Sequence, residues 1–367
     1  MQNPLKYIKP RMKLYGLKLG NFIFRYWPGM FNFFKVEELI RSIPEAAYND
    51  NIARHIVEFH QIRATDIEYY SFPNQLPSWF RKEMYYSERQ IYSLSDVIVS
   101  PKSGACCIPE FGFLESYGSL RKWLYHKPII TLKHKLTIQD EVTCLNHTGF
   151  AHFLMEEVPR LLWILKEKPS IKLIQYDNSP KYIFDIYKIL RDKNILINEP
   201  LLLHENSFYA KRYTFTQAEA YSGFWHKSDI ILLRDAFLKK TTVPAELKIY
   251  VSRKSAARSF ENEQEIEAVL YSQGFQIVAL ETYSFSDQVT LFQNAAVIVA
   301  AHGAGLANLA WCPNGTKVVE LFSHKLFNDC FARLCSQVSG KYYCCRSKGN
   351  GEWGSIDTEE INALLSQ

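Results

Sequence analysis

The sequence lacks three features that would place it in a familiar class of protein. Its eight cysteines form no Cys-x-x-Cys pair and its histidines no His-x-x-x-His pair, so the spacing of a zinc site is missing. Its 43 basic and 38 acidic residues leave a net charge of only +5, too little to indicate a nucleic-acid partner. No apolar core of a secretory signal is visible near residue 1. We therefore expect buried free thiols in a cytoplasmic, reducing compartment.

The chain also has little that could span a membrane. Its one long apolar window, residues 294–311, contains His302, Gly303, Gly305 and Asn308, which fit a strand, a turn and a helix better than a membrane span. A content of 47% hydrophobic residues in 367 is ample for two domain cores. The sequence predicts a two-domain globular protein, soluble or peripheral to a membrane.

The first part of the chain is basic and aromatic. Residues 1–36 hold lysines, arginines and many aromatic residues, but no acidic residue. Such a segment can lie on an anionic membrane surface, or its aromatic rings can pack on the first domain and leave a basic, solvated edge. We expect residues 1–90 to pack on or extend that domain.

From Lys248 onward, short apolar strands alternate with helices. The predicted strands are 248–252, 275–280, 296–300, 317–322 and 341–345, and the predicted helices are 263–272, 286–294, 304–311 and 328–338. Gly274 and Gly340 are expected as left-handed helix caps, and Ser284 with Asp287 as a capping box. Repeated βα units predict a doubly wound parallel sheet over residues 246–350, followed by a helix in 351–367.

The turn His302-Gly-Ala-Gly305 follows one of these strands and opens a helix. Gly303 and Gly305 let a phosphate approach the main chain, and the helix that begins at Ala304 adds the positive end of its dipole. The full Gly-x-Gly-x-x-Gly pattern is absent, because residue 308 is Asn. The turn predicts a phosphate-bearing ligand; the alternative is a tight turn that binds nothing.

Further candidates lie where the other strands end. Ligands of such sheets bind beyond the carboxyl ends of the strands, and the residues there include Arg253, Lys254, Glu281 and Glu320. The cations could bind a diphosphate, and Glu320 could bind two vicinal ribose hydroxyls. The alternatives are a solvated loop for Arg253 and Lys254 and a salt bridge for Glu320.

Residues 91–240 also indicate an α/β domain, joined to the second by a linker at 241–245. Strands are predicted at 96–100, 141–145 and 171–176, and helices at 151–166 and 181–192. His152 and Glu156 are four residues apart and share a helical face. A carboxylate paired with an imidazole beside a cleft is a candidate general base, although the pair could serve structure alone.

Several of these segments resemble the signatures of glycosyltransferase family 61. His-Phe-Leu-Met-Glu-Glu-Val-Pro-Arg at 152–160 is similar to that family's His-Trp-Leu-Leu-Asp-x-Leu-Pro-Arg, with Phe153 and Glu156 in place of Trp and Asp. Tyr-Val-Ser-Arg-Lys at 250–254, His-Gly-Ala-Gly-Leu-Ala-Asn at 302–308 and Val-Val-Glu-Leu at 318–321 resemble further signatures in the same order. The likeness extends from about Asp96 to Cys345, about two thirds of the chain, and an ordered set is far more specific than one motif.

The resemblance implies two facing Rossmann-like domains of the GT-B type, with the acceptor on the side of residues 91–240. It implies an inverting transfer of a sugar from a nucleotide diphosphate donor, without an essential metal or other cofactor. The donor would contact the cations and the glycine turn with its neighbours, namely Arg253, Lys254, His302, Gly303, Ala304, Gly305, Asn308 and Glu320. Glu156, or His152 oriented by Glu156, would deprotonate the acceptor hydroxyl.

The expected acceptor is a glycan or a lipid-linked sugar, as in the synthesis of a capsule or lipopolysaccharide. This implies a cytoplasmic enzyme or one that is peripheral at the inner face of the membrane. Two other functions remain open at this point. A nucleotide-sugar epimerase can also use two Rossmann-like domains, and a nucleotide- or sugar-binding protein would need neither His152 nor Glu156.

Overall fold

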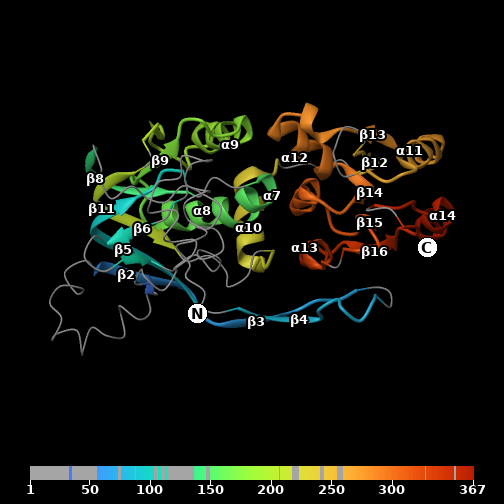
Figure 1. Ribbon diagram of the computed structural model, residues 1–367, viewed down its shortest axis with the longest axis horizontal. Helices are drawn as coiled ribbons and strands as arrows, with labels where there is room; N and C mark the ends of the chain where they lie inside the picture. Colours follow the sequence, from blue (N-terminus) through green and yellow to red (C-terminus); the bar gives the residue numbers. More distant parts are fainter. Residues whose placement is uncertain are drawn as a thin grey trace, which may run out of the picture.

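The computed structural model places most of the chain from residue 56 onward in an α/β architecture with two sheets (Figure 1). The described residues are 33–34, 56–72, 76–86, 88–102, 104, 106–108, 112–114, 136–145, 149–205, 207–216, 223–239, 244–253, 259–326, 328–350 and 353–367. Lys254, most of the basic N-terminal segment and residues 241–243 of the expected linker lie outside them.

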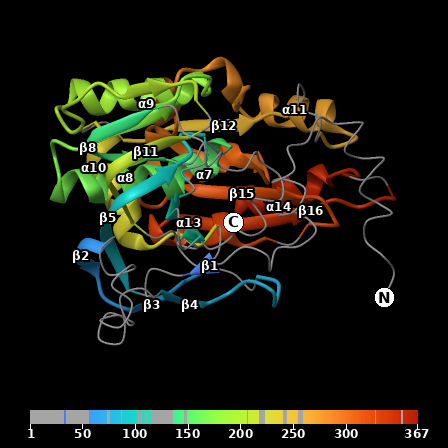
Figure 2. The same cartoon turned by 60° about the vertical axis from the view of Figure 1, so that its left-hand side comes forward.

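Five parallel strands form the sheet of the C-terminal half. They are β12 (Leu247–Val251), β13 (Gln276–Val278), β14 (Ala295–Ala301), β15 (Lys317–Phe322) and β16 (Lys341–Arg346), and they follow the order β13-β12-β14-β15-β16. β12, β15 and β16 run in the same direction in Figure 2. The predicted parallel sheet is therefore confirmed. Because β13 and β14 lie on opposite sides of β12, the strand order reverses between β12 and β14, where α/β sheets bind ligands.

Helices cover both faces of this sheet. α11 (Glu263–Ser272) and α14 (Thr358–Ser366) pack together on one face. α12 (Phe285–Gln293), the helix η5 (Ala304–Trp311) and α13 (Cys330–Gln337) lie on the other face, toward the N-terminal half (Figure 1). The segment 304–311 is a 3-10 helix. Its residues other than Asn308 are small or apolar, and a 3-10 helix is a tighter spiral with i→i+3 bonds.

Two of the three predicted helix caps are confirmed, and the third is wrong. Gly274, after α11, has a φ of +83°, and the Ser284 hydroxyl accepts a hydrogen bond from the Asp287 N–H at 3.2 Å. The cap after α13 is wrong, because Ser339 takes the left-handed conformation with a φ of 58°. Gly340 serves packing instead: a Cβ there would lie 2.6 Å from Sγ of Cys335.

The N-terminal half holds a mixed sheet of nine strands. In the order of the sheet, these are β1 (Phe33–Phe34), β7 (Gly112–Leu114), β6 (Cys106–Ile108), β5 (Arg89–Val99), β11 (Phe208–Thr216), β8 (Thr137–Cys144), β9 (Lys172–Tyr176) and β10 (Leu201–Leu203), with β2 (Ile56–Arg63) also beside β5. β11, β8, β9 and β10 are parallel, whereas β5 is antiparallel to its neighbours. The expected Rossmann-like half is therefore only partly correct, since short connections such as that from β5 to β6 produce antiparallel pairs.

The first helix of this half is interrupted where the sequence predicts one continuous helix. One α-helical turn, α7 (Phe150–His152), leads into a π-helical turn, η3 (Phe153–Glu157), and then into α8 (Val158–Glu167). Pro159 cannot donate the main-chain hydrogen bond that an α-helix requires there, which favours a wider turn just before it. The remaining helices are α9 (Lys181–Asp192), as predicted, and α10 (Lys227–Phe237), which was not predicted.

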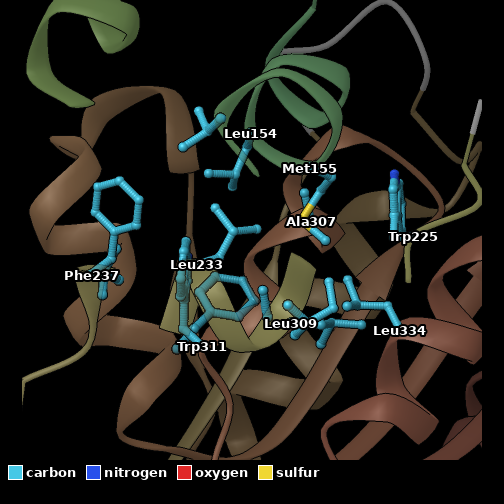
Figure 3. Packing of buried hydrophobic residues seen from close by; sticks show 14 of the residues in the cluster. Leu154, Met155, Trp225, Leu233, Phe237, Ala307, Leu309, Trp311 and Leu334 are labelled. Carbon is cyan, nitrogen blue, oxygen red and sulfur yellow. The ribbon is translucent and has the colours of Figure 1, made fainter. Parts of the chain in front are cut away.

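The helices between the two sheets share one hydrophobic core. Leu154, Met155, Leu233 and Phe237 from the N-terminal half join the cluster that contains Ala307, Leu309, Trp311 and Leu334 (Figure 3). α9 packs on α12, and α7 and α10 pack on η5. The two halves are therefore joined through buried apolar contacts as well as through the chain.

A two-stranded hairpin also links the halves. It consists of β3 (Asp66–Tyr69) and β4 (Glu83–Tyr86) and extends from the first half toward the second (Figure 1). The Gln337 side chain of α13 donates to the Glu68 carboxylate at 2.7 Å, and the Arg81 N–H donates to Asp329 at 2.9 Å. Within the described parts of the chain, no helix has the length and apolar character needed to cross a membrane.

Candidate active site

Four helices from both halves begin around one cleft of about 740 Å³. α7 and α9 contribute Phe150 and Tyr182 from the N-terminal half, and the starts of α12 and η5 contribute Ser284 and Gly305 from the other. Each of these helices follows a strand, so the cleft lies beyond the carboxyl ends of strands from both sheets. Helix N-termini carry partial positive charge and unpaired N–H groups. The fold therefore directs hydrogen-bond donors toward this region.

The glycine turn and Arg253 are in direct contact at the reversal point of the C-terminal sheet. A Cβ on Gly303 would overlap the Arg253 guanidinium. Gly303 is extended, with φ 167° and ψ 177°, so it is close packing and not backbone strain that favours glycine here. The Arg253 main-chain N–H donates to Glu263 at 2.9 Å, and its guanidinium lies over the Trp353 ring at 5.9 Å. The structure brings together the cation and the turn that the sequence predicts.

His302 and Glu320 form a buried pair beside this turn. Nδ1 of His302 lies 2.5 Å from one oxygen of Glu320, and the Tyr342 hydroxyl donates to the other oxygen at 2.5 Å. Glu320 has no exposed surface. The expected binding of ribose hydroxyls by Glu320 is therefore corrected: both of its oxygens are used inside the protein, and it contacts the site through His302.

Asn308 likewise holds the turn from the inside. It is fully buried; its side-chain N–H groups donate to the Gln288 side chain at 2.9 Å and to the Gly305 carbonyl at 3.1 Å, and its oxygen accepts from Trp311 at 3.0 Å. This network ties η5 to α12. The expected direct contact of Asn308 with a donor is accordingly replaced by a role in shaping the Ala304–Gly305 main chain that lines the cleft.

The predicted pair His152 and Glu156 forms on the first helix. Nδ1 of His152 lies 3.0 Å from a carboxylate oxygen of Glu156, and the His152 side chain is half exposed. The hydrogen bond to Glu156 raises the pKa of His152 above its ordinary 6.5, against a smaller lowering by burial. Because Nδ1–H faces the carboxylate, the lone pair of the neutral ring is on Nε2. The pair has the geometry of a histidine base with an orienting carboxylate.

The neighbouring acid and the arginine that ends the same motif are structural. Glu157 and Arg160 form a buried ion pair with two hydrogen bonds of 2.9 Å, and Arg160 also donates to the Thr216 carbonyl at 2.8 Å. Arg160 is 1% exposed. Glu156 on the π turn is therefore the carboxylate that faces His152, and Glu157 is directed into the fold.

A residue far along the chain completes the arrangement at Glu156. The Gly223 N–H donates to the Glu156 carboxylate at 3.0 Å, and the Gly223 carbonyl accepts from Arg333 of α13 at 2.8 Å. Gly223 has a φ of +84°, and a Cβ there would lie 3.3 Å from Cβ of Cys330. Sequence reasoning missed Gly223, Arg333 and Tyr342, because no local motif connects them with partners many residues away.

One group of potential metal ligands occurs among the described residues: Asp66, Glu68 and His226. Nδ1 of His226 lies 3.1 Å from the Ser228 N–H and 2.7 Å from the Ser228 hydroxyl oxygen. Nε2 lies 3.0 Å from Asp66 and 3.3 Å from Glu68. The three side chains join the hairpin to the start of α10.

Residues 150–319 match the family model described as Glycosyltransferase 61. The matched segment begins in α7 and ends in β15, so it contains His152, Glu156, Arg253 and the glycine turn. The resemblance seen in the ordered motifs is thereby confirmed.

Curated relatives match a shorter part of the chain. Over 84 residues it is 42% identical to the protein O-linked-mannose beta-1,4-N-acetylglucosaminyltransferase 2 of Xenopus laevis, covering 22% of this chain and 14% of that protein. The human protein of the same name is 38% identical over 94 residues, covering 24% and 16%. The EGF domain-specific O-linked N-acetylglucosamine transferase of Drosophila melanogaster is 33% identical over 86 residues, covering 22% and 16%. The matches thus span only about one seventh of these relatives.

Proposed function

Because residues 150–319 belong to glycosyltransferase family 61, we propose that this chain transfers a sugar from a nucleotide diphosphate donor to a saccharide acceptor. The observation that supports the proposal is that α7, which carries the first residue of the His152–Glu156 pair, packs on η5, the helix that follows the Gly303 turn and its neighbouring Arg253. Transfer with inversion needs a base for the acceptor and stabilisation of the leaving diphosphate, and these two groups supply both.

The donor diphosphate is assigned to the Arg253 side of the turn. An arginine fork matches phosphate oxygens in charge and geometry. Main-chain N–H groups at the start of η5 add donors for the same anion. These groups can neutralise a diphosphate without a metal ion, so the proposal includes no metal.

The acceptor is assigned to the cleft of about 740 Å³. Lys181, Asp185 and Glu281 line it, and their side chains form no hydrogen bond or ion pair with any residue that the structure describes. Phe150 and Tyr182, whose rings meet edge to face at 5.3 Å, supply an apolar wall. Polar groups around an aromatic wall suit the hydroxyls and the apolar face of a sugar.

His152 is proposed to remove the acceptor proton through Nε2, with Glu156 holding the ring. The acceptor oxygen then bonds to the anomeric carbon on the face opposite the diphosphate, which leaves with the electron pair of the broken C–O bond. Glu156 is proposed to act through His152, because its nearer oxygen already accepts bonds from His152 and Gly223.

Two classes of acceptor are proposed for testing. A surface glycan or a lipid-linked sugar follows from the sequence resemblance, and an O-linked protein glycan follows from the names of the relatives. Those names also make N-acetylglucosamine the first donor sugar to examine. A panel of nucleotide sugars in a thermal-shift assay would select the donor, because a ligand that binds the folded state raises the melting temperature.

The proposal is tested with His152→Asn and Glu156→Gln, compared with Arg253→Ala. The first two are expected to lower kcat by about 100-fold or more while donor affinity stays unchanged, since general-base catalysis contributes about 10² to 10⁴ in rate. Arg253→Ala is expected to weaken nucleoside diphosphate binding, measured by calorimetry, by about tenfold or more. Near-normal turnover in both pair variants would refute the base assignment, and unchanged diphosphate affinity in Arg253→Ala would refute the donor site.

A further inference from the structure

The main chain of Gly223 links the histidine–carboxylate pair of the first half to an arginine of the second. The Gly223 N–H donates to the Glu156 carboxylate at 3.0 Å, and the Gly223 carbonyl accepts from the Arg333 guanidinium at 2.8 Å. Gly223 lies in the connection between β11 and α10, whereas Arg333 lies on α13. One polar group of this residue is therefore used toward the pair, and the other toward the opposite half of the molecule.

Arg333 is itself held firmly inside the fold. It is 3% exposed, and one nitrogen of its guanidinium forms an ion pair with Asp329, four residues earlier, while another donates to Gly223. The guanidinium also lies over the Phe224 ring, 4.6 Å from its centroid. A planar guanidinium that binds two acceptors at once fixes their relative positions. The Gly223 carbonyl is thus held at a defined place relative to α13.

The backbone conformation of Gly223 makes such an anchor necessary. Its φ is +84°, and a Cβ there would lie 3.3 Å from Cβ of Cys330. Glycine enters this region freely, but it enters other regions of φ and ψ as readily. The residue alone therefore does not keep its N–H directed at Glu156. The contacts on its two sides must do so.

The residues after Gly223 have further contacts with α13 and with the hairpin. The Trp225 carbonyl accepts from Gln337 of α13 at 2.5 Å and from the Tyr86 hydroxyl of β4 at 3.1 Å. The Trp225 ring also packs beside Phe331, with centroids 5.7 Å apart. Loss of the Arg333 contact alone is therefore expected to change the direction of the Gly223 peptide without releasing the segment that follows it.

The Gly223 N–H in turn restrains the Glu156 carboxylate. The oxygen of Glu156 that accepts from Gly223 is the one that lies 3.0 Å from Nδ1 of His152. The Glu156 side chain is 22% exposed, so water can compete for its oxygens. A hydrogen bond from a fixed main-chain N–H favours the rotamer that faces the imidazole. Weakening the Gly223 contact should therefore weaken the pair.

We propose that Arg333 is a positioning residue for the histidine–carboxylate pair, acting through the main chain of Gly223 on Glu156 and through Glu156 on His152. Its effect on transfer rests on the proposed function. The helix that carries Arg333 belongs to the half that carries the proposed donor turn. The pair of one half is therefore oriented by the other half, and it has its reactive geometry only when the two halves are packed together.

The test follows the protonation of the His152 ring by NMR of isotope-labelled histidine, with the spectrum of His152→Asn identifying its signals. Arg333→Met removes both hydrogen bonds of the guanidinium but keeps an unbranched side chain. The pH midpoint of the ring is expected to fall toward the ordinary 6.5, because the hydrogen bond to Glu156 is the first cause that raises the pKa of His152. The kcat of sugar transfer is expected to fall about tenfold with donor KM unchanged, since small displacements of a reacting group are costly.

The other groups around this ring do not obscure the titration. Glu157, the second carboxylate that raises the pKa of His152, is paired with Arg160. The helix η5, which packs on α7, has no titratable side chain. Tyr182 of α9 contacts the ring of Phe150, and burial raises the pKa of Tyr182 to about 12. It therefore stays neutral where an imidazole titrates.

Two further variants separate positioning from stability. Arg333→Lys keeps the charge beside Asp329, but an ammonium does not hold two acceptors in the geometry of a guanidinium. It should lower the ring midpoint less than Arg333→Met, and it decides the question if Arg333→Met does not fold. Arg234→Met is the matched control, because Arg234 of α10 also reaches the other half and donates to the carbonyls of Ala310 at 2.6 Å and Cys312 at 2.9 Å. It should lower the melting temperature without moving the ring midpoint or kcat.

The outcomes separate this inference from the proposed function. A ring midpoint that stays or rises in the Arg333 variants overturns the inference, because the pair then forms without Arg333. An equal fall in Arg234→Met also overturns it, since general loosening would explain both. A lower midpoint with unchanged kcat contradicts the role in transfer. If His152→Asn retains near-normal turnover, the base assignment fails, and the ring titration alone decides whether Arg333 orients the pair.

Discussion

At the scale of single residues, the sequence leaves open whether His152 or Glu156 acts as the base. The position of the proton between these two side chains distinguishes the two roles. Glu156 accepts hydrogen bonds from His152 and from the main chain of Gly223. A carboxylate that already binds two donors is a weaker proton acceptor, whereas it raises the basicity of the imidazole. The spacing of His152 and Glu156 could indicate that they interact. It could not indicate which one faces the substrate, because that depends on Gly223.

The raised pKa of His152 predicts the direction of the pH dependence of transfer. A base must be deprotonated to act, so kcat/KM is expected to rise with pH, with a midpoint above the ordinary value of 6.5 for histidine. Glu156→Gln removes the principal cause of the shift, and the residual activity should show its midpoint at lower pH. The measurement is a pH–rate profile of both proteins. A midpoint that is the same in both contradicts the pairing as the cause.

At the scale of elements, segments with clear local periodicity form where the sequence predicts them. α9, α11 and β15 have the predicted bounds, because amphipathic spacing and capping residues act within a few positions. Where the helices differ from the prediction, the causes are contacts with distant parts of the chain or unusual local chemistry. Pro159 breaks the first helix into a π turn, η5 forms a 3-10 spiral, and the cap after α13 moves to Ser339. Hydrophobic patterns cannot distinguish these variants of a helix.

The glycine turn gives a prediction at this scale. Gly303→Ala places a methyl group where the Arg253 guanidinium lies, while the extended backbone accepts alanine. The guanidinium should move and the η5 helix should remain, so nucleoside diphosphate affinity is expected to fall about tenfold with little loss of stability. Calorimetry and thermal unfolding measure the two effects.

The matched control for this substitution is Gly149→Ala, which adds the same methyl group to open space before α7. It should leave diphosphate affinity unchanged. Equal affinity losses in the two variants would show that Arg253 is not the residue disturbed.

At the scale of the whole molecule, the proposed site requires both halves. The proposed reactive residues His152 and Glu156 come from the N-terminal half, and Arg253 and His302 come from the C-terminal half. Residues of both halves, such as Phe150 and Gly305, line the cleft. The sequence predicts both sets of residues, since each lies in a local motif. It could not predict the mixed first sheet, the shared core or the β3–β4 hairpin, because these depend on pairings between distant segments such as Glu68 and Gln337.

The contacts of the β3–β4 hairpin with the C-terminal half predict how strongly the hairpin resists local opening. Gln337 donates to Glu68 and to the Trp225 carbonyl, which also accept from Tyr70 and Tyr86. Gln337→Ala therefore removes two hydrogen bonds without leaving either acceptor unpaired, at a cost of about 0.5 to 1.5 kcal/mol for each. The hairpin should then open more often, and trypsin should cleave faster after Arg81 and Lys82. Limited proteolysis followed by mass spectrometry measures this.

Gln273→Ala is the control for this change. It removes a comparable glutamine contact, a hydrogen bond of 2.7 Å to Asn362, on the face that carries α11 and α14. Cleavage at the hairpin should be as slow as in the wild-type protein. Similar acceleration in both variants would mean that general destabilisation, and not the hairpin contact, controls cleavage.

The core that runs through the helices of both halves has a consequence for how such chains can be recombined. One buried cluster contains Trp311 and Leu309 of the C-terminal half together with Leu154 and Phe237 of the N-terminal half (Figure 3). Close-packed interiors tolerate few mismatches in side-chain volume. A chimera that exchanges one half at the connection near residue 244 would join surfaces selected in different ancestors. Crossovers that keep residues 150–319 together keep these four side chains and both sets of proposed reactive groups in one parent chain.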